Sequence, residues 1–135
     1  MTKKLLILAG GTGGHIYPAL AVAKRWQAKG GEIAWIGTRR GLEYKLVPEH
    51  GFTLSLINIK GLRNKGLLAK LFAPVALLLS FVQALILIYK IKPNVVLGMG
   101  GYVSGPSGLA AWCLRKPLIV HEQNAIAGKT NVYLA

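Results

Sequence analysis

Short apolar runs alternate with longer stretches of helical spacing along most of this chain. The runs predict five β-strands, at residues 5–8, 32–37, 53–59, 94–98 and 118–121. Helical spacing predicts one helix from Pro18 to the glycine pair at 30 and 31, a second over 42–48, and a third that ends at Leu114. Strands and helices that alternate in this way form right-handed βαβ units. The pattern therefore predicts an α/β fold, a Rossmann-like parallel sheet with helices on both faces.

Residues 71–89, LFAPVALLLSFVQALILIY, form an apolar segment that is just long enough to span a membrane. A spanning helix would place the strands before and after it on opposite sides of the bilayer, which a single parallel sheet does not allow. The segment is therefore predicted to be a crossover helix that covers the sheet with one side. Its excess apolar surface should meet a partner or a membrane interface, where the basic segment 60–70 would meet anionic head groups. A fully buried core helix is the alternative.

Glycine-rich or polar segments follow the first, fourth and fifth predicted strands, at residues 10–15, 98–107 and 121–124. Ligands of parallel α/β sheets bind beyond the carboxyl ends of the strands, so these segments are expected on one edge. The first is a tight turn before a helix, where free backbone N–H groups can face an anion. Ile16 in place of a third glycine argues against a dinucleotide fingerprint, and no NTPase phosphate loop is present. Another phosphate-bearing ligand remains, beside a purely structural turn.

The second segment combines several glycines with the hydroxyl groups of Tyr102, Ser104 and Ser107. Backbone amides and hydroxyls suit a diphosphate, and Tyr102 could stack on a sugar or simply plug the edge of the sheet. In the third segment, His121 lies in an apolar run and is expected to be a hydrogen-bonded core histidine. Glu122 is expected to orient a neighbour or a substrate hydroxyl. Asn124 is expected to be either a helix N-cap or a ligand contact.

Charge narrows the choice of partners. The chain has 135 residues, enough for one ordinary core, and 17 basic against 4 acidic residues give a formal net charge of +13. Such a charge indicates an anionic partner, either nucleic acid, a phosphorylated substrate or acidic lipid. Nucleic acid is the weakest of these, because the basic residues are not interleaved with exposed aromatics or set in a known binding motif. The single Cys113 predicts a buried thiol in a reducing compartment, and the first strand leaves no room for a signal peptide.

Three blocks of the chain resemble the MurG family, membrane-associated N-acetylglucosaminyltransferases of bacterial peptidoglycan synthesis that convert lipid I into lipid II. The blocks are AGGTGGHIYPALAVA, VVLGMGGYVSGPSGLAAW and HEQNAIAGKTN, and the segments between them are also similar. The resemblance implies the N-terminal half of a two-domain GT-B glycosyltransferase. It would bind the acceptor and lie on the cytoplasmic face of the cell membrane as a peripheral protein.

The resemblance also implies site residues. It assigns donor binding, of UDP-GlcNAc, to Thr12, Gly13, Gly14 and Asn124. It assigns the acceptor diphosphate to Gly11, Gly100, Gly101, Tyr102 and Ser104. His15 corresponds to a family histidine considered as general base at the acceptor hydroxyl, a role that suits an imidazole at neutral pH, and Glu122 would support the site. Neither a metal nor a cofactor is implied.

One departure from the family keeps a second function open. The chain stops at Ala135 within a helical pattern and without the C-terminal domain that holds most of the UDP-sugar, so residues 1–135 are expected to be a truncated acceptor domain that is inactive alone. The alternative is a non-catalytic acceptor-binding and membrane-recruiting subunit that requires a separate nucleotide-sugar-binding chain. Transfer activity after mixing with a C-terminal domain would distinguish a truncated enzyme from such a subunit.

Overall fold

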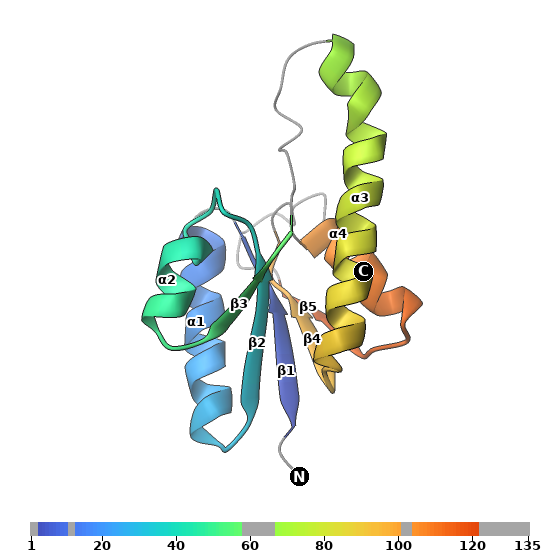
Figure 1. Cartoon of the computed structure of the whole chain (residues 1–135). Coiled ribbons are helices and arrows are strands. Elements are labelled where there is room, and N and C mark those ends of the chain that lie inside the picture. Colours follow the sequence, from blue (N-terminus) through green and yellow to red (C-terminus); the bar gives the residue numbers. More distant parts are fainter. Residues whose placement is uncertain (1–2, 11–12, 58–66, 101–103, 122–135) are drawn as a thin grey trace.

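The computed structural model describes residues 3–10, 13–57, 67–100 and 104–121. Five strands and four helices alternate along these segments (Figure 1). In chain order they are β1 (Lys4–Leu8), α1 (Gly13–Ala28), β2 (Glu32–Gly37), α2 (Glu43–Glu49), β3 (Thr53–Leu56), α3 (Leu67–Ile91), β4 (Val95–Gly98), α4 (Ser104–Cys113) and β5 (Leu118–Val120). The predicted α/β class is confirmed.

All five strands are parallel and lie in the order β3-β2-β1-β4-β5. β1 is the central strand, and its Leu8 pairs with Ile36 of β2 on one side and with Gly98 of β4 on the other. Helices α1 and α2 lie on one face of the sheet and α3 and α4 on the other (Figure 1). This arrangement follows from right-handed crossovers that run in opposite directions from β1. The carboxyl ends of the strands consequently share one edge.

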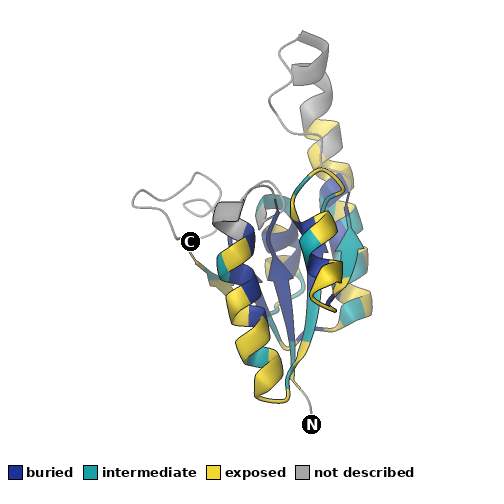
Figure 2. Ribbon diagram, turned by 90° about the vertical axis from the view of Figure 1, so that its left-hand side faces the viewer, coloured by how far each residue is buried: buried dark blue, intermediate teal, exposed yellow. Residues whose placement is uncertain are grey.

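Alternation along β1 divides the core into two clusters. Leu5 and Ile7 belong to the cluster under α1 and α2, whereas Leu6 and Leu8 belong to the cluster under α3 and α4. These side chains are buried because successive residues of a strand point to opposite faces and helices cover both faces here. Figure 2 shows the same division, with buried residues in the strands and on the inner sides of the helices.

Several predicted boundaries differ from the structure, among them the start of α1 and the end of β3. α1 begins at Gly13, so Pro18 lies inside the helix and not at its start. The N–H that proline lacks would bond to the carbonyl of Gly14 in the first turn, where the loss of one bond matters least. β3 ends at Leu56, although Ile57 still donates its N–H to the Gly37 oxygen at 3.0 Å. The remaining residues of the predicted strand lie outside the described segments.

The long apolar segment forms α3, which packs against the sheet with a narrow inner side. Ser80, Ala84 and Ile88 are buried there, while large apolar side chains such as Leu78 and Leu79 are 60% and 58% exposed. The alternative of a fully buried core helix is therefore wrong, and the predicted excess apolar surface is present. Within the described segments, no helix combines the length and hydropathy needed to cross a membrane.

The prediction for Cys113 is also wrong. Its thiol is exposed, because Cys113 ends α4 on the side away from the sheet, next to the exposed Trp112. The sheet-facing positions of α4 are the alanines Ala110 and Ala111, which are fully buried.

Candidate functional site

The ends of β1, β4 and β5 lie side by side at the carboxyl edge, held by bonds that continue the sheet ladder. The Met99 N–H donates to the Leu8 oxygen at 3.0 Å, and the His121 N–H donates to the Gly98 oxygen at 2.8 Å. The segments that follow these three strands therefore start from adjacent points of the edge. A single ligand could contact all three, as expected for a parallel sheet.

The first glycine loop begins next to Ala9, whose carbonyl oxygen accepts a hydrogen bond from a buried tryptophan. Trp35, on β2, is fully buried and donates its indole N–H to the Ala9 oxygen at 2.9 Å. This bond satisfies a backbone oxygen just beyond β1 and orients the chain as it leaves the sheet. Neither the apolar pattern nor the motif singled out Trp35. Its position one strand away from the loop could be found only once the parallel pairing of β1 and β2 was known.

Three of the site residues predicted in the first loop lie at the start of α1. Gly13, Gly14 and His15 form the first turn of that helix, so their backbone N–H groups belong to the set that lacks intrahelical partners. This is a suitable position for an anionic ligand, because the positive end of the helix dipole lies there. Gly11 and Thr12 lie outside the described residues.

The second loop leaves β4 through Gly100, whose backbone adopts a φ of 94°. Ser104 is the first residue of α4, and Ser107 is fully buried one turn later, where its hydroxyl has no hydrogen-bond partner among the described residues. The Ser107 hydroxyl is thus not open to solvent, in contrast to the expectation that the loop hydroxyls would be free for a ligand. Gly101, Tyr102, Glu122 and Asn124 lie outside the described residues.

A neighbouring loop, for which the sequence pattern predicted no role, also reaches this edge. It connects β2 to α2 and carries Thr38, followed by the exposed Arg39 and Arg40. Glu43, the first residue of α2, is fully buried, and one carboxylate oxygen accepts the Thr38 N–H at 2.9 Å and the Thr38 hydroxyl at 3.0 Å. Glu43 is one of only four acidic residues in the chain, and this scarcity was the sequence signal that could have pointed to the loop, whereas its burial shows only in the structure.

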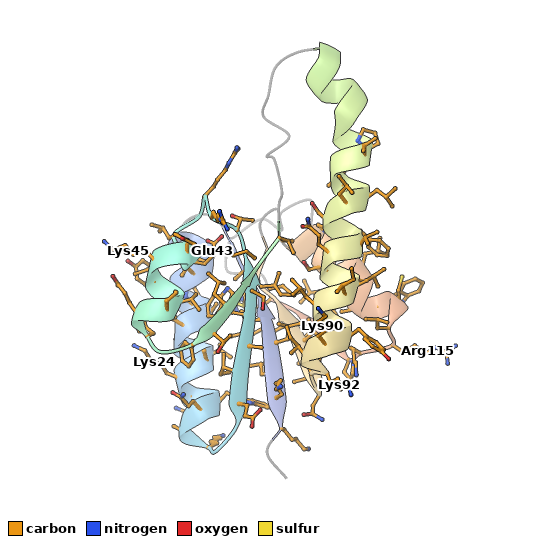
Figure 3. All side chains as sticks on the ribbon, in the orientation of Figure 1. Lys24, Glu43, Lys45, Lys90, Lys92 and Arg115 are labelled. Atoms are coloured by element: carbon orange, nitrogen blue, oxygen red, sulfur yellow. The ribbon has the colours of Figure 1, made fainter. Side chains whose placement is uncertain are left out.

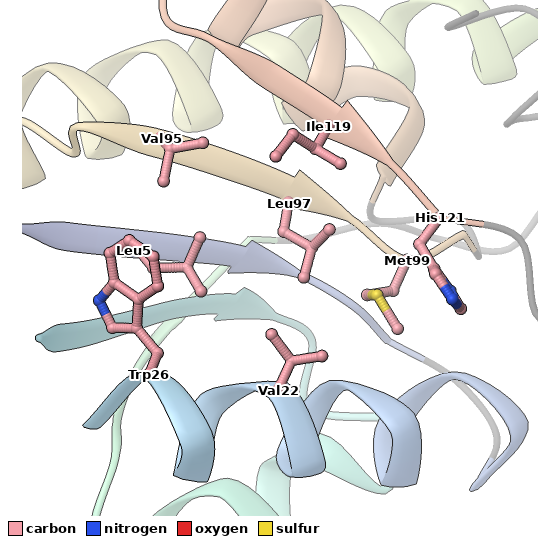
Figure 4. Close-up of a pocket in the computed structure, with 8 residues that line it drawn as sticks. All are labelled: Leu5, Val22, Trp26, Val95, Leu97, Met99, Ile119 and His121. Atoms are coloured by element: carbon pink, nitrogen blue, oxygen red, sulfur yellow. The ribbon is translucent and has the colours of Figure 1, made fainter. Parts of the chain in front are cut away.

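His121 does not occupy a core position. It is exposed and lines one end of a mainly apolar groove of about 210 Å³ on the α1 face of β4 and β5 (Figure 4). β5 is the edge strand, and α1 packs mainly against β1 and β2, so Ile119 and His121 at the end of β5 stay open to solvent on this face. The other lining residues are Leu5, Val22, Trp26, Val95, Leu97, Met99 and Ile119.

The described residues contain no group of three or more histidine, cysteine, aspartate or glutamate side chains that could hold a metal ion. What the described part of the edge offers instead is backbone amides in the first turns of α1 and α4 and the nearby Arg39 and Arg40. Such groups recognise phosphate and carboxylate oxygens.

Comparison with known proteins decides the family. The model of the glycosyltransferase family 28 N-terminal domain matches residues 5–135. The chain belongs to glycosyltransferase family 28. It is 54% identical over 135 residues to a protein of Haemophilus ducreyi and 58% identical over 135 residues to one of Nitrosococcus oceani. Both are named UDP-N-acetylglucosamine--N-acetylmuramyl-(pentapeptide) pyrophosphoryl-undecaprenol N-acetylglucosamine transferase.

Solved structures place this family 28 chain among known folds. The crystal structure of Acinetobacter baumannii MurG matches 98% of the chain with a TM-score of 0.87 and 43% identity. The Streptomyces glycosyltransferase SsfS6 matches with a TM-score of 0.68 at 16% identity, which shows the fold alone. The chain thus has the fold of GT-B N-terminal domains and is homologous to the N-terminal part of MurG. It spans 38% of the length of the two named relatives and of the Acinetobacter protein.

Proposed function

We propose that this chain is the acceptor-binding part of an enzyme that transfers GlcNAc from UDP-GlcNAc to lipid I and so forms lipid II. The observation that carries the proposal is identity of 54% and 58% along the whole chain to transferases named for these substrates. The fold supports it, because the first turns of α1 and α4 open on the same edge of the sheet. In this proposal the uridine is bound mainly by the part of the protein that the relatives have beyond the matched length.

The two glycine loops divide the substrates in this proposal. The loop after β4, with Gly100, Gly101, Tyr102 and Ser104, binds the acceptor diphosphate together with Gly11. The loop after β1, with Thr12, Gly13 and Gly14, reaches the donor sugar nucleotide, as does Asn124, and Glu122 supports the acceptor side. The positions of Gly100 after β4 and of Ser104 at the start of α4 support the first assignment.

His15 is the candidate general base. Its imidazole would take the proton from the acceptor hydroxyl while the hydroxyl oxygen attacks the anomeric carbon and the bond from that carbon to UDP breaks, which inverts the configuration. The position of His15 in the first turn of α1 supports this role, because the positive end of the helix dipole favours the neutral imidazole that can accept a proton.

The test uses the full-length enzyme with His15→Ala. We expect kcat to fall by about 10² to 10⁴ while KM for UDP-GlcNAc changes little, because a general base acts in the transition state. His50→Ala is the matched control, since His50 is exposed just after α2 and its ring nitrogen lies 2.7 Å from the Leu46 oxygen of the same helix. An unchanged kcat with a raised KM would reduce His15 to a binding residue.

The exposed side of α3 and α4 is proposed to bind the anionic membrane surface, so that the protein is peripheral on the cytoplasmic face. We call this side the helix platform, and its exposed large apolar residues are Val75, Leu77, Leu78, Leu79, Val82, Ile86, Tyr89, Leu109 and Trp112. Lys90, Lys92 and Arg115 lie near its lower end in Figure 3. Apolar side chains flanked by cations are typical of surfaces that enter a lipid interface. The predicted membrane contact comprised residues 71–89 and the basic segment 60–70, of which residues 60–66 lie outside the described residues, and it did not include α4.

Binding by the 135-residue chain alone tests the division between donor and acceptor. UDP-GlcNAc should bind no more tightly than about millimolar, because a few hydrogen bonds of roughly 0.5 to 1.5 kcal/mol each barely offset the cost of immobilising a ligand. A lipid I analogue with a short lipid should bind more tightly in the same calorimetric titration. A micromolar dissociation constant for UDP-GlcNAc would mean that the donor site lies in this part of the protein.

A further inference from the structure

The loop between β2 and α2, residues 38–42, is a built feature of the carboxyl edge and lies beside the first glycine loop. Because Leu8 pairs with Ile36, Thr38 is level with Gly10, and the two loops leave neighbouring strands at the same height. Arg39 and Arg40 follow at once, and both are exposed. The loop thus brings two adjacent guanidinium groups to the edge at which the proposed substrates bind.

A buried carboxylate holds this loop in place. Glu43 accepts both the N–H and the hydroxyl of Thr38, at 2.9 and 3.0 Å, from a fully buried position (Figure 3 labels Glu43 at the top of α2). The surrounding backbone is adapted to it, since a Cβ added at Gly37 or at Gly41 would collide with the Glu43 side chain. Taking a carboxylate out of water is unfavourable unless hydrogen bonds replace the lost hydration. This unfavourable burial of Glu43 occurs beside a loop, residues 38–42, whose only exposed charged groups are the two arginines.

A structural purpose alone does not account for the arrangement. A short connection from a strand to a helix needs a turn, and glycine or serine residues supply one without a buried charge. Two adjacent exposed arginines repel each other and gain nothing from being held, unless an anion binds between or beside them. Guanidinium groups bind carboxylate and phosphate oxygens in a planar, two-pronged geometry, which rewards a fixed position.

We infer that residues 38–42 form a third substrate-binding loop, in which Arg39 and Arg40 bind an acidic oxygen group of the acceptor. Glu43 is its positioning residue. The inference rests on the proposed function, in which the acceptor carries a diphosphate and a peptide, each of which has acidic oxygens. The loop would therefore contribute to acceptor affinity and specificity and leave the donor untouched.

The first experiment compares two variants of equal charge in calorimetric titration with a short-chain lipid I analogue. Arg39→Gln with Arg40→Gln should weaken binding about five- to twentyfold, as expected for partly exposed charge-assisted hydrogen bonds. Lys24→Gln with Arg25→Gln removes an adjacent, exposed basic pair from the outer side of α1, where Figure 3 labels Lys24 well below the edge. This control should weaken binding less than twofold.

Equal losses in the two variants would overturn the inference, because a general effect of net charge would then explain both. Failure of the unsubstituted chain to bind the analogue at all would instead overturn the proposed acceptor-binding function. In the full-length enzyme, the arginine variant should raise KM for the acceptor and leave KM for UDP-GlcNAc unchanged. A raised KM for UDP-GlcNAc would overturn the assignment to the acceptor.

The role of Glu43 is tested by non-additivity. Glu43→Gln keeps one oxygen that can accept from Thr38 and should fold, whereas Glu43→Ala removes both bonds. If Glu43 acts through the arginines, the arginine substitutions should add less than twofold to the loss of acceptor affinity in the Glu43→Ala background. A full additional loss would overturn the positioning role, and Glu43→Gln should recover part of the affinity that Glu43→Ala loses. Thermal unfolding of each variant shows whether the chain is still folded.

Two probes separate the possible sources of the anion. A muramyl diphosphate analogue without the peptide should bind the arginine variant and the unsubstituted chain equally if the loop recognises a peptide carboxylate. If the loop recognises the diphosphate, this analogue should bind the arginine variant about five- to twentyfold more weakly than the unsubstituted chain. In that second case, inorganic pyrophosphate should also compete with the analogue more weakly in the arginine variant.

Discussion

The helices on the two faces of the sheet are followed by different residue types in the left-handed backbone conformation. α1 and α2, on one face, are followed by Gly30 and Gly51 in the left-handed region, at φ of 87° and 80°. α3 and α4, on the other face, are followed by Lys92 and Arg115 in the same region, at φ of 53° and 56°. Glycine adopts this conformation without strain, whereas a residue with a Cβ is disfavoured there. The second face thus places basic side chains where stability alone would favour glycine.

The faces also differ in where their large side chains point. Trp35 is fully buried under α1 and α2 and holds the Ala9 oxygen, while Trp112 of α4 is 70% exposed. The inner sides of α3 and α4 combine small residues such as Ala84 and Ala110 with the fully buried Ile88. The first face therefore contributes stability and loop geometry. The second face turns many of its large apolar residues outward, which is explained if it serves a surface outside the molecule.

The largest expected effect comes from removing the apolar residues of the helix platform. Leu78→Ser, Leu79→Ser and Trp112→Ser together should weaken binding to anionic vesicles by about a hundredfold or more, because each apolar side chain that enters the interface contributes roughly 1 kcal/mol or more. Co-sedimentation with liposomes measures this. The control is Leu42→Ser with Tyr44→Ser, two exposed apolar residues on the first face. A similar loss in the control would remove the difference between the faces.

The next effect concerns the small residues on the inner side of α4. Ala110→Leu should lower the free energy of unfolding by about 1 to 3 kcal/mol, since the fully buried Ala110 has no space for a larger side chain. The exposed Leu109 on the same helix is the control, and Leu109→Ala should change the free energy by about 0.5 kcal/mol or less. Urea unfolding checks both. A tolerated Ala110→Leu would show that this face is loosely packed.

A smaller effect separates the two tryptophans. Trp35→Phe should lower the free energy of unfolding by about 1 to 2 kcal/mol, because the Ala9 oxygen loses its buried donor. Trp112→Phe should change it by about 0.5 kcal/mol or less, because the side chain is largely exposed. If both substitutions had the same effect, the indole bond to Ala9 would not be what holds the first loop.

Much of this fold could be predicted from the sequence because buried parallel strands produce continuous apolar runs. Residues 5–8 are such a run, and both neighbours of β1 were predicted as strands. The start of α1 was misplaced because Pro18 favours a first turn but is tolerated one turn later. His121 was misjudged because an apolar run does not reveal that its strand is the edge of the sheet with one face open.

The sequence could predict only those parts of the candidate site that are continuous motifs, and not contacts that depend on packing. Motifs identified the segments after β1, β4 and β5, and the parallel sheet brings those strand ends together. The hydrogen bonds from Thr38 to Glu43 were not predicted, because the burial of a charged side chain depends on packing. The same holds for Trp35, whose partner Ala9 follows a different strand, β1. The roles of His15, Tyr102 and Asn124 stay predictions.

The smallest expected effect tests the basic helix ends directly and uses two variants of Lys92 that remove the same charge. Lys92→Gly relieves the left-handed backbone, whereas Lys92→Gln keeps it, so the glycine variant should be more stable by about 1 kcal/mol in urea unfolding. Both variants should bind anionic vesicles about fivefold more weakly than the unsubstituted chain at low salt, since one cation near such a surface contributes roughly 1 kcal/mol. High salt should remove this difference. Equal stability of the two variants would show that Lys92 carries no strain, and unchanged vesicle binding would show that it does not face the lipid. Both expected results together would mean that this helix end sacrifices stability for a cation at the membrane surface.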